Sequence, residues 1–179
     1  MKKITNYVTA FITSIILLVV GCATINALSS AQIAKIGSVV TQVADQGAVY
    51  AIHQGVDNAL YFKAANTVID NFANGTDLSP TALQAALAKV SGTNQWVGLA
   101  IAAVVTAYDY SYSTYISGQL TNAPAAKVWL LAAETGFKQA LASTGTGLKL
   151  QVAVPPDFIV NGKVSKTVIK AKIKAALKK

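Results

Sequence analysis

The sequence is short of the residues on which most catalytic and metal sites depend. Its 179 residues include one His, one Cys, seven acidic residues and no Arg. Nucleophilic catalysis needs a nucleophile with a base held beside it, and metal sites ordinarily recruit several His, Cys or carboxylate ligands. The acidic residues are scattered, and no two of them share a helical spacing of three or four. We therefore expect neither an enzyme nor a bound metal or cofactor.

Other scarcities narrow the class of protein further. A single Cys allows no disulfide framework, and only four Pro is not the composition of a disordered chain. Without Arg there is no bidentate guanidinium to read phosphate or guanine, so we expect no nucleic-acid partner. The one His, His53, is predicted to lie near the end of a helix rather than to act as a base.

The single Cys closes an apolar segment close to the N-terminus. Two lysines follow the initial Met, residues 4–20 are mostly apolar, and small residues come next, which is the arrangement of a secretory signal peptide. The sequence VVGC that ends at Cys22 resembles the lipobox of bacterial lipoproteins, with Val where Leu is commoner. The resemblance implies cleavage before Cys22, a diacylglycerol on its thiol and an acyl chain, such as palmitate, on its new amine.

This resemblance also implies a location and leaves two alternatives. Ala23, rather than Asp, after the Cys is typical of lipoproteins kept at the outer membrane, so we expect a lipid-anchored envelope protein facing the periplasm. Two or more acyl chains hold a protein at a membrane stably, whereas a single chain holds it only marginally. A cut after Ala23 or Ala27 would instead release a soluble secreted protein. An uncleaved segment, residues 4–22, approaches the roughly 20 residues of a membrane-spanning helix.

Nearly all the positive charge of the mature chain lies at its other end. Residues 163–179 contain seven Lys and no acidic residue, whereas residues 22–162 contain six Lys and seven Asp or Glu. In a helix the apolar residues of this tail form one stripe, and four lysines line its flank: Lys166, Lys170, Lys174 and Lys178. Such a helix suits an anionic lipid surface or peptidoglycan. The alternative is that its apolar stripe docks on the body. The chain also ends in Lys, as does the murein lipoprotein, which is joined to peptidoglycan through that residue.

Between these ends the sequence predicts an all-α, Ala-rich bundle of about five helices, with 31 Ala in the whole chain. Apolar residues at steps of three and four predict helices over 31–53, 57–73, 80–90, 95–117 and 124–145. In the second helix the apolar stripe is Leu60, Ala64, Val68 and Phe72. Residues 148–154 alternate like a short strand. The predicted organisation is signal peptide 1–21, lipidated Cys and linker 22–28, bundle 29–146, extended linker 147–162 and Lys-rich tail 163–179.

The helix at 95–117 is the most apolar of the body and ends in a tyrosine cluster. Its first half is apolar on every side, which predicts a buried position at the centre of the bundle. Further on, Tyr108, Tyr112 and Tyr115 share one face, and Asp109 is the only charge. One interpretation is a Tyr-lined groove that stacks on a sugar or peptide, with Asp109 accepting a hydrogen bond. The other is the solvent-facing end of a core helix, where the rings pack and the hydroxyls reach water or backbone.

Together these features favour a non-enzymatic, lipid-anchored cell-envelope protein with a structural or interaction role. Its partners are expected to be the membrane, anionic lipid or peptidoglycan, and other proteins. The alternative is a membrane-inserting protein that resembles small phage holins in outline. In that case the N-terminal span stays uncleaved, the 95–117 helix inserts, and the basic tail remains cytoplasmic.

Overall fold

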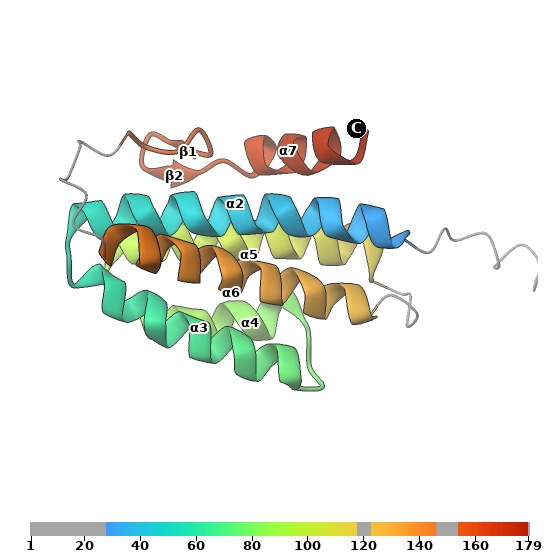
Figure 1. Cartoon of the computed structure of the whole chain (residues 1–179), viewed down its shortest axis with the longest axis horizontal. Coiled ribbons are helices and arrows are strands. Elements are labelled where there is room, and N and C mark those ends of the chain that lie inside the picture. The colour runs from blue at the N-terminus through green and yellow to red at the C-terminus, as the bar shows by residue number, and fades with distance from the viewer. Residues whose placement is uncertain (1–27, 118–122, 146–153, 179) are drawn as a thin grey trace, which may run out of the picture.

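The computed structural model describes residues 28–117, 123–145 and 154–178. Within these ranges the chain forms six helices and one small hairpin, which confirms the predicted all-α class (Figure 1). The helices are α2 (Ser30–Gln54), α3 (Asn58–Asn74), α4 (Pro80–Ser91), α5 (Gln95–Tyr115), α6 (Ala123–Gly145) and α7 (Lys166–Lys178). The hairpin pairs β1 (Ile159–Val160) with β2 (Lys163–Val164) in antiparallel register. No helix in these ranges combines the length and apolar character needed to cross a bilayer.

Local capping sets where the helices begin. Before α2, the Ser29 hydroxyl accepts from the Gln32 amide, and the Gln32 side chain accepts from the Ser29 amide at 2.9 Å. This is the predicted capping box, which satisfies two amides that a helix start leaves without partners. Before α4, the Ser79 hydroxyl accepts from the Ala82 amide, and Pro80 occupies the first position of the helix. Each of the five predicted body helices is present, with bounds within two residues of the prediction.

Two helices form the centre of the bundle, and one of them is α2, which packs against α6, α5, α7 and α3. Its inward face includes Ile36, Val40 and Val43, which are fully or almost fully buried. The 95–117 helix, predicted to be central, shares this position: α5 packs against each of the other described helices, α2, α4, α7, α6 and α3. Close approach depends on small residues, since a Cβ added to Gly47 would lie 3.3 Å from the Cα of Ala100 on α5.

The apolar stripe predicted for the second helix faces the core only in part. Leu60 and Ala64 are exposed on α3, Val68 and Phe72 are half-buried against the core, and the fully buried side chains include Phe62 and Ile69. The Phe62 ring packs against Phe137 of α6, with ring centroids 5.0 Å apart. Both stripes have helical spacing, and contact with α6 buries the one that carries Phe62. Spacing alone does not distinguish two such stripes.

The segment before the tail is a packed hairpin, where the sequence predicted the end of an extended linker. Phe158 is fully buried and its carbonyl accepts from the Ser165 amide at 2.8 Å. Asn161 and Gly162 both have positive φ, 51° and 68°, which is the two-residue turn that Asn-Gly favours. The Asn-Gly pair was thus a usable sequence signal. The predicted strand at 148–154 lies, apart from Val154, outside the described residues.

Candidate functional site

The structure describes the tyrosine cluster but not the lipidation candidate. Cys22 lies outside the described residues, so its modification stays a prediction. Tyr108 is buried in the core, and its hydroxyl donates to the carbonyl of Leu78 at 2.6 Å. Burial, followed by the charges of Tyr112 and Asp77, raises the pKa of Tyr108 well above its usual range. This ring and hydroxyl are therefore occupied within the fold.

The rest of the cluster does not gather around Asp109. Tyr112 is half-buried, with its ring 5.8 Å from that of Tyr108 at an interplanar angle of 43°. Tyr115 is also half-buried, and burial is the main cause that raises its pKa. Asp109 is exposed and accepts from the Ser113 hydroxyl at 3.2 Å. The packing of Tyr108 agrees with the interpretation of this segment as the end of a core helix.

The tail forms the predicted amphipathic helix, and its apolar stripe docks on the body. Ile169 and Ile173 of α7 are fully buried, and α7 packs against both α2 and α5. The four flank lysines named from the sequence are all exposed: Lys166, Lys170, Lys174 and Lys178. Docking therefore leaves these four lysines exposed on one flank of α7, which we call the lysine face.

Two polar contacts also link the tail to the rest of the fold. The Lys170 ammonium lies 5.3 Å from the centroid of the Tyr110 ring, a cation–π geometry. Lys172 pairs with Asp157 of the hairpin at 2.8 Å. Both partners keep substantial exposure, so this pair adds little stability compared with the two buried Ile side chains. Apolar burial, rather than charge pairing, holds α7 in place.

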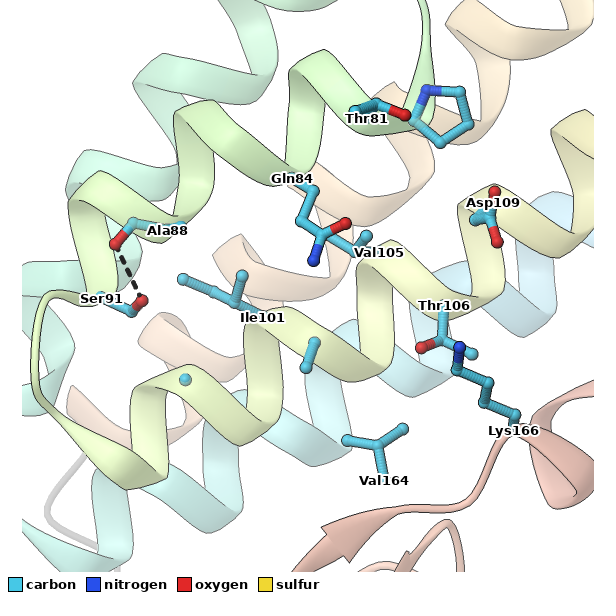
Figure 2. Close-up of a pocket in the computed structure, with 13 residues that line it drawn as sticks. Thr81, Gln84, Ala88, Ser91, Ile101, Val105, Thr106, Asp109, Val164 and Lys166 are labelled. Atoms are coloured by element: carbon cyan, nitrogen blue, oxygen red, sulfur yellow. Dashed lines mark hydrogen bonds between the residues drawn. The ribbon is translucent and has the colours of Figure 1, made fainter.

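A groove of about 430 Å³ runs along the outer side of α5, and the sequence analysis did not predict it (Figure 2). One wall is α4, and the other is formed by Val164 of β2 and Lys166 of α7. The floor consists of residues at helical spacing on one face of α5: Gly98, Ile101, Ala102, Val105, Thr106 and Asp109. The helix is apolar all round because one face lies in the core and another forms this floor. This second stripe, with the small residues Gly98 and Ala102 and with Asp109 at its end, was the sequence signal for the groove.

The lone histidine and the acidic residues do not form a recognisable centre in the described part of the chain. His53 lies in the last turn of α2, as predicted, and its Nδ1 is buried with no hydrogen-bond partner in that part. Across residues 28–117, 123–145 and 154–178, no three His, Cys, Asp or Glu side chains converge as metal ligands would.

Comparisons with protein-family models, with curated proteins and with solved structures give no match to this chain.

Proposed function

We propose that this chain is a non-enzymatic lipoprotein of the cell envelope, held at the outer membrane and facing the periplasm. Lipid on Cys22 is the main anchor, and the lysine face of α7 makes a second contact with an anionic surface. We take that surface to be anionic lipid. Peptidoglycan, which lies in the same compartment, is the second candidate. The helical bundle then serves as the part that meets other envelope components.

The observation that carries the proposal is the antiparallel placement of α7 along α2. In Figure 1 the end of α7 lies at the end of the bundle where α2 begins. The same alignment brings Lys35 and Gln42 of α2 beside Lys172 and Ala176 of α7, around one shallow hollow. A lipid attached upstream of α2 and the last lysines of α7 therefore belong to the same end of the molecule.

Chain length makes this shared end relevant to a membrane. Five residues lie between Cys22 and Leu28, the first described residue, and the six residue-to-residue steps span at most about 22 Å. Each lysine close to an anionic surface contributes about 1 kcal/mol, within a screening length of about 8–10 Å. Two attachments on one end reinforce each other, because the first raises the effective concentration of the second.

The docked state of α7 specifies how the second contact works. Its apolar residues Ile169 and Ile173 are already buried against α2 and α5, so they are not available for insertion into lipid. The contact is then electrostatic, made by ammonium groups at the surface, and salt weakens it. This differs from an interfacial helix that lays its apolar face in the bilayer.

The test is removal of the lipid acceptor in the full precursor expressed in a bacterial host. Wild type should fractionate with membranes, and its intact mass should equal the chain from Cys22 onward plus lipid. Cys22→Ala should move to the soluble fraction or remain an uncleaved precursor without lipid. Ala27→Ser keeps the VVGC sequence and should behave as wild type. A wild-type mass that begins at Met1, or that lacks lipid, would refute the anchor.

A further inference from the structure

The groove along α5 has a composition that differs between its two ends. At one end are the only charges of its lining, Asp109 of α5 and Lys166 of α7, with Thr106 beside them (Figure 2). Along the middle, Ile101 and Val105 of α5 and Val164 of the hairpin line an apolar side, and the Gln84 amide reaches in from the α4 wall (Figure 2). The volume falls within the range of about 300–1,000 Å³ that small-molecule sites occupy.

The two charges are available for a ligand. In the described part of the chain, neither Asp109 nor Lys166 has an ion-pair partner within 4.0 Å. Asp109 accepts one hydrogen bond, from Ser113, which leaves acceptor capacity on its carboxylate. Lys166 is also the first residue of α7, so the positive end of the helix dipole adds to its ammonium charge. One site for a cation and one for an anion therefore lie at the same end of the groove.

The floor of the groove is open because of a glycine. A Cβ built on Gly98 would meet no atom within 4 Å, so the space above it is free. Ala102, one turn further along α5, is exposed and equally small. Small residues on a helix that is otherwise rich in Val and Ile leave room for an apolar group beside the walls formed by α4 and Val164. The groove is thus shaped for a short apolar body with a charged head.

We propose that this groove binds a free α-amino acid with a large apolar side chain. Its ammonium group pairs with Asp109, its carboxylate pairs with Lys166, and its side chain lies over Ile101 and Val105. A free amino acid fits better than a peptide because its two charges sit on one carbon, as the two complementary groups sit at one end. The inference rests on the groove alone and is independent of the lipid anchor.

Calorimetry on the full chain in detergent tests the proposal, with L-leucine and L-phenylalanine as probes. We expect saturable binding of both. N-Acetyl-L-leucine lacks the ammonium, L-leucinamide lacks the carboxylate, and in trileucine the charges are far apart. Each of these should bind about tenfold more weakly or worse, since a charge-assisted contact is lost. No saturable binding of either amino acid, or equal binding of the blocked forms, would overturn the proposal.

Variants then assign the binding to the groove. Ala102→Phe should abolish binding by filling the floor beside Ile101 and Val105. Asp109→Asn should remove the preference for a free ammonium, and Lys166→Gln the preference for a free carboxylate. These two charge variants lie on exposed positions, so they test the site independently of any effect of Ala102→Phe on folding. The matched controls Asp57→Asn and Lys127→Gln, both exposed and outside the groove, should bind as wild type does. Wild-type binding by both charge variants would show that the groove is not the site.

Discussion

At the scale of single residues, Gly136 is where α6 comes closest to α2. A Cβ built there would lie 2.6 Å from the Cβ of Ala44 and 2.9 Å from the backbone nitrogen of Asp45, and it would overlap the Thr41 carbonyl oxygen. Two of these three atoms belong to the backbone, which cannot turn aside as a flexible side chain can. The Thr41 hydroxyl also donates to the carbonyl of Ala132 at 3.0 Å, one turn before Gly136. Close approach and this hydrogen bond depend on each other.

We therefore predict that Gly136→Ala lowers the free energy of unfolding by about 1–3 kcal/mol, the usual cost of overpacking. The better helix propensity of Ala offsets only part of this cost, at most about 1 kcal/mol. Gly98→Ala is the matched control, since its added Cβ meets only open space. It should raise stability by about 0.4–1 kcal/mol. Urea unfolding measures both, and a Gly136→Ala protein at least as stable as wild type would contradict the close-approach argument.

A second interaction at this scale crosses the same helix pair. Trp129 of α6 is fully buried, and its indole Nε1 donates to the carbonyl of Ile33 on α2 at 3.1 Å.

Two asparagines make similar hydrogen bonds between other elements. The Asn94 side-chain amide donates to the Asn58 side-chain oxygen at 2.7 Å, and the Asn58 side-chain amide donates to the carbonyl of Ala51 at 2.6 Å. Buried polar groups need such partners, so these side chains fix how the helix ends meet.

At the scale of elements, α7 is joined to the bundle by a narrow apolar contact. Only Ile169 and Ile173 of this helix are fully buried. Val168, Ala176 and Leu177 are half-buried against the core, and Lys172 forms a partly exposed ion pair with Asp157. A helix of 13 residues is marginal by itself in water, so most of its stability comes from that packing. The helix should therefore loosen more easily than α2 and α6, which bury much more of their surface.

We predict that Ile169→Ala together with Ile173→Ala detaches α7 while the bundle stays folded. Each substitution removes buried apolar volume, which costs about 2–5 kcal/mol at a buried Ile. Amide hydrogen exchange should rise across α7 and change little in α2 and α6. Thr167→Ala, at an exposed position on the same helix, is the control and should leave exchange unchanged. Equal loss of protection in all three helices would mean that α7 unfolds only with the whole domain.

At the scale of the whole molecule, the charge is polarised. The lysine face lies on one side of an otherwise nearly neutral body, and α7 ends near the start of α2 (Figure 1). Lys166, at the far end of α7, lines the groove, whereas Lys174 and Lys178 lie toward the shared end. The four lysines that share a helix flank therefore divide between two proposed roles.

We predict that the triple variant Lys170→Gln, Lys174→Gln, Lys178→Gln weakens binding of the unlipidated chain to anionic vesicles by roughly a hundredfold, at about 1 kcal/mol per lysine. Lys166 is left in place so that the groove keeps its charge. The control replaces three exposed lysines of the body, Lys63, Lys89 and Lys127, which changes the net charge equally. Cosedimentation with phosphatidylglycerol vesicles at several salt concentrations provides the measurement. Equal loss in the two triple variants would show that net charge, rather than the lysine face, drives binding.

Much of the local structure is determined by the sequence itself. Ser29, Ser79 and Pro80 mark helix starts through contacts with residues at most three positions away, so the five body helices were predictable to within two residues. The amphipathic character of α7 follows from spacing alone for the same reason. Caps and amphipathic stripes depend on neighbours along one helix, and those neighbours are visible in the sequence.

Only the tertiary structure decided which faces are used and what they form. Leu60 and Phe62 both belong to apolar stripes at helical spacing, and the partner helix α6 selected the stripe that carries Phe62. Tyr108 became a core residue because a carbonyl from the loop before α4 lies within reach of its hydroxyl. The groove exists because α4, α5 and the hairpin with α7 meet around Gly98 and Asp109. These outcomes depend on contacts between residues far apart in the chain, whose distances no spacing rule contains.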